Sequence, residues 1–286
     1  MKPARPQRLF FTIILIIALL PVSLAQAGLP GPYPPDPPPV PTPPPDSNFN
    51  YVKVADARGQ GGVASQIEFG TTGKDKIIEY GGLDGITQYI SGDAGNDWLL
   101  QVGGTQASTM TIDGGTGDDT IYQYGGQGTS DMAVYGGAGN DTIIQVGGPG
   151  DNRTTVSGGE GNDYIEVYGG SGNNTLNVDG GIGDDVFKVY GGPHNNTINY
   201  TVSDGNDAAT ILGGRGGPNT LNIVGGFKNF TVKDYQGSIL CQQGTGGSTI
   251  TVANLHRITV HGAGYKVIWQ YTGGKVSSFV TLLLGD

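Results

Sequence analysis

An aspartate recurs at an interval of 22 residues through the middle of the chain. These carboxylates, called the aspartate row below, are the clearest candidates for functional residues in the sequence. Each aspartate closes a glycine-rich turn of the form Gly-x-Gly-(Asn/Asp)-Asp, which is degenerate at both ends of the series. The row consists of Asp75, Asp97, Asp119, Asp141, Asp163, Asp185 and Asp207. Carboxylates at one fixed spacing can bind cations or accept hydrogen bonds from the backbone of a turn.

The 22-residue period predicts the elements that position this row. A Gly-Gly pair keeps the same interval from Gly81 to Gly213, so each unit holds two glycine-rich turns and two short β-prone runs. One such unit is residues 136–157, GGAGNDTIIQVGGPGDNRTTVS, which is typical of one coil of a β-solenoid. We expect an all-β fold: a parallel β-solenoid or β-roll with about seven regular coils, and degenerate end coils that act as caps.

Apolar side chains recur at fixed positions of the unit and predict a core that grows along the axis. Stacked at ~4.8 Å, equivalent positions form continuous columns. Three such columns are Ile77, Leu99, Ile121, Ile143, Ile165 and Phe187; Tyr80, Val102, Tyr124, Val146, Tyr168, Tyr190 and Leu212; and Ile90, Ile112, Val134, Val156 and Val178.

Composition excludes several classes of protein. The 286 residues include 53 Gly, and each Gly in a helix interior costs roughly 1 kcal/mol, which argues against a helical globule. Residues 1–27 hold three of the 15 bases and no acid, so the remainder carries 12 − 25 = −13 charges. Such a surface repels nucleic acid and anionic lipid. A single cysteine, Cys241, excludes cysteine zinc sites and disulfide frameworks.

The chain divides into four parts. Residues 1–27 have the basic start, short apolar run and Ala-Gln-Ala end of a signal peptide, with an uncleaved anchor as the alternative. Residues 28–50 predict a proline-rich polyproline II linker that holds the rest away. Residues 51–223 predict the solenoid, and residues 224–286 a degenerate β continuation and C-terminal cap. We therefore expect an extracellular protein, secreted or on the cell surface, or a periplasmic one, with no membrane span in the mature chain.

Residues 70–214 contain turns such as GGTGDD, GGAGND and GGEGND, which resemble the GGxGxDxUx calcium repeat of the repeats-in-toxin (RTX) family. The resemblance implies a β-roll in which Ca²⁺ lies between successive turns, held by the aspartates and by turn carbonyls. It extends the expected metal row to the residues before six of the aspartates: Asn96, Asp118, Asn140, Asn162, Asp184 and Asn206. The 22-residue unit, which keeps aspartate only in alternate turns, departs from the family pattern.

Electrostatics independently indicate a cation. Neighbouring aspartates ~5 Å apart repel by roughly 3 kcal/mol at an effective dielectric near 20, and no row of Lys or Arg matches them. Calcium suits irregular cages of carboxylate and carbonyl oxygens. The alternative is a cation-free ladder of Asp and Asn in the turns. In the other turn row, Asn152, Asn173, Asn174, Asn195 and Asn196 predict hydrogen-bonded stacking.

Enzymatic signals are sparse. His194, His256 and His261 lie in unrelated contexts, and no nucleophile motif is present. We expect a non-enzymatic calcium-binding rod with a structural, adhesive or matrix role, which contacts extracellular polysaccharide or like subunits. Two alternatives are a calcium-dependent β-helical polysaccharide lyase and an ice-binding protein. Against an ice-binding face, Asp131 and Arg153 interrupt the threonine series.

Overall fold

The computed structural model describes residues 35–282, except 63–64, 215, 226–229, 235–236, 242–247, 263–264 and 273–274. For 230–241 and 262–282 it describes the backbone alone. The expected signal peptide at 1–27 and the side chain of Cys241 lie outside the described part. Within that part, no helix is long and apolar enough to cross a membrane.

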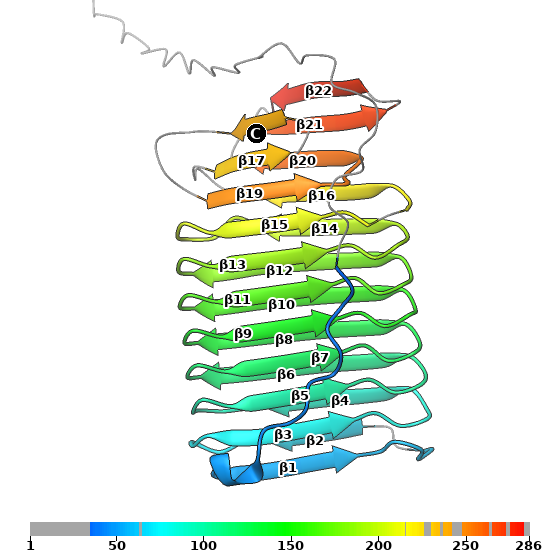
Figure 1. The fold of residues 1–286 in the computed structure, drawn as a ribbon, viewed down its shortest axis with the longest axis vertical. Coiled ribbons are helices and arrows are strands. Elements are labelled where there is room, and N and C mark those ends of the chain that lie inside the picture. Colours follow the sequence, from blue (N-terminus) through cyan, green and yellow to red (C-terminus); the bar gives the residue numbers. More distant parts are fainter. Residues whose placement is uncertain are drawn as a thin grey trace, which may run out of the picture.

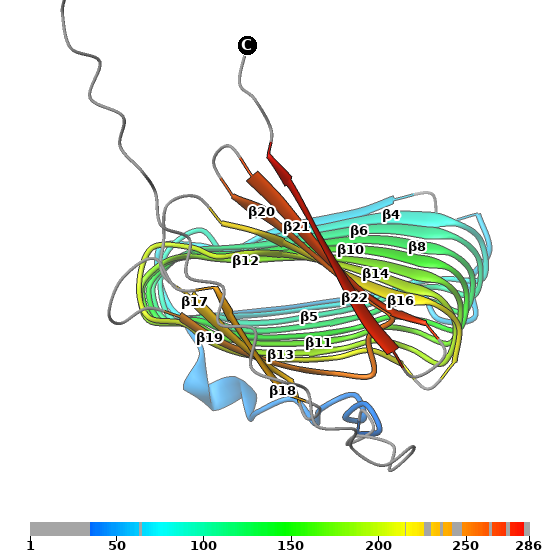
Figure 2. The same cartoon turned by 90° about the horizontal axis from the view of Figure 1, so that it is seen from above.

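Two 11-stranded sheets face one another and form a flattened rod in the described part of the chain (Figures 1 and 2). Sheet A consists of β1 (Tyr51–Asp56), β3 (Asp75–Tyr80), β5 (Trp98–Val102), β7 (Thr120–Tyr124), β9 (Thr142–Val146), β11 (Tyr164–Tyr168), β13 (Val186–Tyr190), β15 (Ala208–Leu212), β19 (Ser248–Ala253), β17 (Phe230–Asp234) and β18 (Gly237–Cys241). Sheet B consists of β2 (Ser65–Phe69), β4 (Ile86–Ser91), β6 (Ser108–Thr116), β8 (Ser130–Ala138), β10 (Asn152–Glu160), β12 (Asn174–Ile182), β14 (Asn196–Thr201), β16 (Asn219–Val224), β20 (Arg257–Gly262), β21 (Tyr265–Thr272) and β22 (Lys275–Leu282).

The parallel register confirms the predicted β-solenoid. From β3 to β15, strands of sheet A one coil apart pair at an offset equal to the 22-residue period, as in Ile121↔Ile143 of β7 and β9, whereas β1 pairs with β3 at an offset of 24. The offset becomes 23 between β14 and β16, where Asn196 pairs with Asn219. Between β16 and β19 the chain forms β17 and β18, which lie beyond β19 in sheet A, so β15 pairs with β19 at a much longer sequence separation. The 22-residue register therefore ends where the sequence repeat becomes degenerate.

The interior is a continuous apolar column, as the sequence predicts. Ile77, Ile121, Phe187 and Ile90 all lie in one buried cluster between the sheets. The column from Tyr80 to Leu212 is also apolar and largely buried, but it belongs to a second cluster, with Ile78 and Leu100. Successive side chains of a strand point to opposite faces, so this second cluster lies on the outer face of sheet A.

The two ends of the stack are closed differently. In the first coil, Lys53 and Glu68 occupy the interior positions above Ile77 and Ile90 and form an ion pair of 3.3 Å. Inward-pointing charge discourages further strands from adding to the open edges. At the other end, β17–β18 and β20–β21–β22 are antiparallel hairpins that splay away from the coils (Figure 2).

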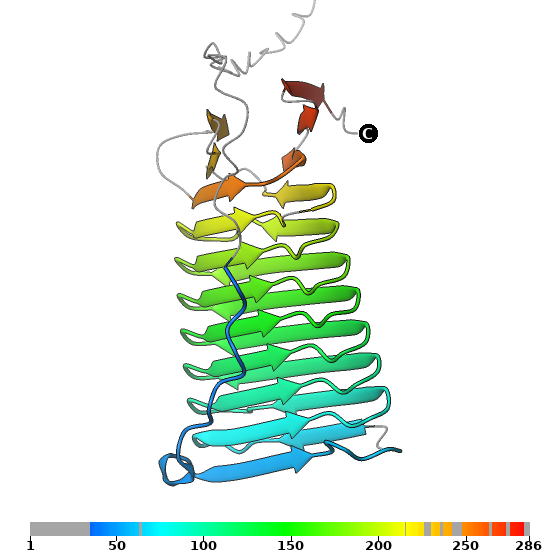
Figure 3. The same cartoon turned by 45° about the vertical axis from the view of Figure 1, so that its right-hand side comes forward.

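The described part of the proline-rich stretch does not extend away from the rod. Its described part, residues 35–45, leads into a short 3-10 helix, η1 (Asp46–Asn48), and lies along the coils of sheet A (Figures 1 and 3). This differs from the spacer that the sequence predicts. The reason is that sheet A presents outward-facing apolar side chains, on which Phe49 packs.

Candidate functional site

The aspartate row lines one inner corner of the rod, where the chain passes from sheet B to sheet A. Asp75 begins β3, and the other six members each precede a strand of sheet A. Every member is at most 2% exposed. Oδ1 of Asp119, Asp141 and Asp163 accepts the backbone N–H of the aspartate one coil earlier, at 2.8 Å. The structure thus brings all seven predicted aspartates together as a hydrogen-bonded ladder between coils.

The second carboxylate oxygen is the unusual feature of the row. In five internal members Oδ2 is buried and has no hydrogen-bond partner; these are Asp97, Asp119, Asp141, Asp163 and Asp185. The end members differ, because hydroxyl residues reach them: Ser203 and Ser248 donate to Asp207 Oδ2 at 3.2 and 3.1 Å. A buried oxygen without a donor costs about 1–3 kcal/mol, and more when it is charged.

Glycine makes room for this oxygen. A methyl group added to Gly136 would stand 2.4 Å from Asp141 Oδ2 and 2.4 Å from the carbonyl oxygen of Gly158 in the next coil. Two acceptor oxygens therefore converge on each such glycine. The turn also needs positive φ, which Gly137 (114°) and Gly139 (138°) supply. The glycines of the motif hence serve both the turn and the placement of the carboxylate.

Burial makes the carboxyl groups of the row weak acids. Desolvation raises the pKa of Asp119 to about 8; the N–H of Asp97 lowers it, and the charges of Asp141 and Asp97 raise it further. The same desolvation raises the pKa of Asp97 to about 7 and that of Asp141 to about 6. The pKa values of Asp163 and Asp185 are likewise raised, each to about 6. At neutral pH the row is therefore divided between protonated and charged members.

Calcium fits this corner only in part. Calcium takes six to eight oxygens at about 2.3–2.6 Å, whereas the row offers two converging oxygens at each glycine. The turn carbonyls are already acceptors; for example, Gly117 N–H donates to Ala138 O at 2.7 Å. Among the described residues, no group of three or more acidic, His or Cys side chains could hold a metal. These residues therefore do not form a complete calcium coordination shell. Calcium binding stays a prediction, which the partnerless Oδ2 atoms support.

The residues that precede the aspartates form a separate, exposed ladder. Asp118 Oδ1 accepts the N–H of Asn140 at 2.8 Å, and Asn140 Oδ1 accepts the N–H of Asn162 at 2.9 Å. Asn96, Asp184 and Asn206 are exposed in the same series. The structure thus separates the thirteen predicted ligands into an inner and an outer row.

The opposite inner corner holds the predicted asparagine stack. Asn174 Nδ2 donates to Gly170 O, Gly172 O and Asn196 Oδ1, each at 2.9 Å. Its Oδ1 accepts the N–H of Gly170 at 3.1 Å. The series is Asn152, Asn174, Asn196 and Asn219, at most 4% exposed, whereas Asn173 and Asn195 belong to the exposed face of the same turns. In this corner every polar atom of the Asn174 side chain has a partner.

A column of buried polar residues on the inner face of sheet A was not predicted from the sequence. Gln101 Nε2 donates to Glu79 Oε2 at 2.9 Å, and Gln123 Nε2 donates to Gln101 Oε1 at 2.8 Å. Gln145 continues the ladder, and burial raises the pKa of Glu79 to about 8. The available signal is the strand alternation, which puts these residues on the same face as Ile77 and Ile121, two positions earlier.

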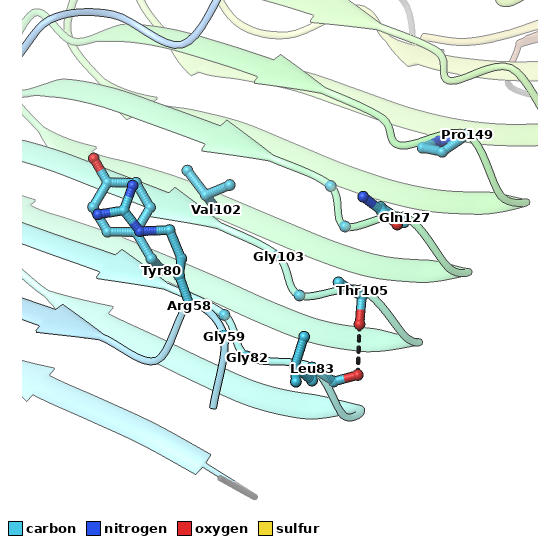
Figure 4. Close-up of a pocket in the computed structure, with 14 residues that line it drawn as sticks. Arg58, Gly59, Tyr80, Gly82, Leu83, Val102, Gly103, Thr105, Gln127 and Pro149 are labelled. Carbon is cyan, nitrogen blue, oxygen red and sulfur yellow. Dashed lines mark hydrogen bonds between the residues drawn. The ribbon is translucent and has the colours of Figure 1, made fainter. Parts of the chain in front are cut away.

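Among the described residues, no catalytic group gathers around either row. Half of the residues that line the groove along the Gly-Gly corners are glycines, and the Arg58 guanidinium lies over the ring of Tyr80, 4.0 Å from its centre (Figure 4). Lys188 bonds Glu166 and Tyr164 on the outer face of sheet A, away from the inward aspartates.

Comparison with known proteins finds no matching family model, no similar curated protein and no similar solved structure. The fold and the two corner ladders therefore define the class: a parallel β-solenoid with buried polar corners.

Proposed function

We propose that the chain is an exported, non-enzymatic rod with an adhesive or matrix role. The observation that carries this proposal is the uninterrupted stack of coils, in which the same positions pair from β3 to β16. Eight stacked coils at ~4.8 Å give a rod nearly 40 Å long with repeated outer faces. Repeated faces suit multivalent contact, since weak binding at each coil multiplies along the rod.

The inward direction of the aspartates supports the non-enzymatic part of this proposal. A polysaccharide outside the rod cannot reach carboxylates that are at most 2% exposed. The structure argues against the ice-binding alternative, because two charged residues interrupt the threonine column that such a face needs. This column of sheet B consists of Thr109, Asp131, Arg153 and Thr175.

Two experiments test the role. The mature chain, residues 28–286, should bind beads coated with an extracellular acidic polysaccharide and should lose that binding under competition by free polymer. Incubated with the same polymer, it should generate no unsaturated ends and no shorter chains. Turnover of the polymer would favour the lyase, and absence of binding would remove the adhesive role. Recovery from the medium of protein that begins at Gly28 would test export.

Calcium is the proposed cation of the aspartate row, on the strength of the five partnerless Oδ2 atoms. Protons are the competing means of neutralisation. Calorimetry at pH 8, where most of these carboxyls are charged, distinguishes calcium from protons. Only neutralisation by calcium predicts calcium uptake and a rise in melting temperature. If millimolar calcium does not change the melting curve, protonation remains the only means of neutralising the aspartate row.

A further inference from the structure

The strap, residues Pro35–Phe49, crosses the outer face of sheet A before the chain enters β1 (Figures 1 and 3). Two hydrogen bonds of 2.9 Å fasten it: Tyr124 Oη donates to Pro39 O, and Lys76 Nζ donates to Pro44 O. Lys76 also pairs with Asp46. Lysine is rarely buried, yet Lys76 is only 4% exposed, so the strap covers it.

The strap meets the sheet with one edge of a polyproline II helix. Pro38, Pro41 and Pro44 are half-buried at a spacing of three that matches the three residues per turn of polyproline II, and Pro43 beside them is half-buried as well. Pro45 has φ −59° and ψ 141°, within that conformation. Most of the residues between the half-buried prolines are exposed. Such a period is expected of a docked helix rather than of a free spacer.

The length of the strap fits the sheet beneath it. From Lys76 to Tyr124 is two coils across the sheet and four residues along the strand, a diagonal of roughly 16 Å. The five residues from Pro39 to Pro44 span about 15.5 Å in polyproline II. Carbonyls at this interval therefore reach both donors without a bend.

The surface under the strap is apolar and shielded from water. Outward-facing Ile78, Trp98 and Leu100 are 4%, 7% and 0% exposed, and Phe49 packs on their cluster. Farther along the rod, Val186 stands in the same column as Trp98 and is 41% exposed. Aromatic-lined faces with hydrogen-bond donors are the usual binding sites for polyproline II segments.

We propose that the outer face of sheet A, from Lys76 to Tyr124, is a binding site for proline-rich peptides in the polyproline II conformation, with the strap as its resident ligand. When the strap is released, the face accepts a proline-rich segment in trans. The proposal is independent of the role of the rod and of calcium.

The test uses the whole mature chain with a weakened strap. Pro38→Gly, Pro41→Gly and Pro44→Gly together remove three half-buried rings and the polyproline II bias. The probe is a fluorescein-labelled peptide of residues 35–49, followed by fluorescence anisotropy. The triple variant should bind it at least tenfold more tightly than the wild-type chain, whose site is filled. Equal or absent binding by the triple variant would overturn the proposal.

Matched controls locate the binding. In the triple variant, Trp98→Ala should reduce peptide affinity at least tenfold, whereas Val186→Ala, outside the covered area, should leave it unchanged. A probe peptide with the same three glycines should not bind. Binding unaffected by Trp98→Ala would contradict the assigned face.

A milder variant serves if the triple variant lacks a cooperative melting transition. Tyr124→Phe removes only the hydrogen bond to Pro39. Measured in a Trp269→Phe background so that Trp98 alone reports, it should raise acrylamide quenching of Trp98 about twofold. Unchanged quenching would overturn the proposal.

Discussion

The two inner corners of the rod solve the same problem with different side chains. Each has to satisfy backbone groups where the chain turns between sheets. Asn174 does so completely, since its amide both donates and accepts. Asp141 satisfies one N–H with Oδ1 and leaves Oδ2 without a donor. The asparagine corner is thus stable without help, whereas the aspartate corner depends on protons or a cation.

Breaking the asparagine corner should have the largest effect. Asn174→Ala leaves the polar groups of Gly170, Gly172, Asn152 and Asn196 short of a partner inside the rod. At ~1–3 kcal/mol for each unsatisfied group, partly relieved by relaxation, the free energy of unfolding should fall by about 3–5 kcal/mol. Urea denaturation measures it.

Asn173→Ala is the matched control, because Asn173 is exposed beside the same turn. It should cost less than about 1 kcal/mol. Similar losses for the two variants would contradict the difference between inner and outer positions.

The aspartate corner should make stability depend on pH. The folded pKa values of Asp97, Asp119 and Asp141, about 7, 8 and 6, exceed the ordinary ~3.9, so the folded state binds more protons between those limits. The free energy of unfolding is therefore greatest below about pH 4 and falls as pH rises through 6 to 8. Without calcium the fall should be at least about 3 kcal/mol.

Urea denaturation between pH 4 and pH 8, in the presence of chelator, measures this slope. A profile that is flat or rises with pH would show that the buried carboxyls are relieved by some other means. Added calcium should restore stability at pH 8 if the cation binds the row.

Replacing one carboxylate by an amide should sharpen the comparison. Asp141→Asn keeps an acceptor for the N–H of Asp119 and can donate toward the carbonyl oxygen of Gly158. It should stabilise the chain by about 1–2 kcal/mol at pH 8 and have little effect at pH 4. Thermal melts at both pH values measure this, and destabilisation at pH 8 would indicate that the charge itself is needed.

The outer ladder should matter least. Asn140→Ala removes two exposed hydrogen bonds, one accepted from Asn162 N–H and one donated to Asp118 Oδ1, and water replaces both. The expected loss is about 0.5 kcal/mol by urea denaturation. A loss above about 2 kcal/mol, or a loss of calcium uptake, would give Asn140 a larger part than its exposure indicates.

Much of the fold is predictable because one period governs it. A fixed 22-residue period, with apolar positions such as Ile121 and Ile143 in phase, allows only parallel stacking in register. The same period also places the aspartates in one row. It does not determine that they face inward, because that direction depends on the φ angles of glycines such as Gly137 and Gly139, which follow no alternation.

The strap is harder to foresee. Proline-rich sequence has the same polyproline II signature whether it is free or docked. The deciding residues lie elsewhere: Trp98 and Leu100 alternate with interior residues and therefore have to face outward. The column from Tyr80 to Leu212 is buried, as predicted, but in a cluster of its own on the outer face, because period alone does not distinguish the two faces of a sheet.

The constant register of the internal coils has an evolutionary consequence. Each coil from β5–β6 to β11–β12 presents to its successor the surface that its predecessor presents to it. A tandem duplication or deletion of one repeat unit anywhere in this stretch of the gene would thus rejoin matching surfaces. Rod length can then vary between descendant genes in steps of ~4.8 Å, while the Lys53–Glu68 pair and the C-terminal hairpins are inherited unchanged.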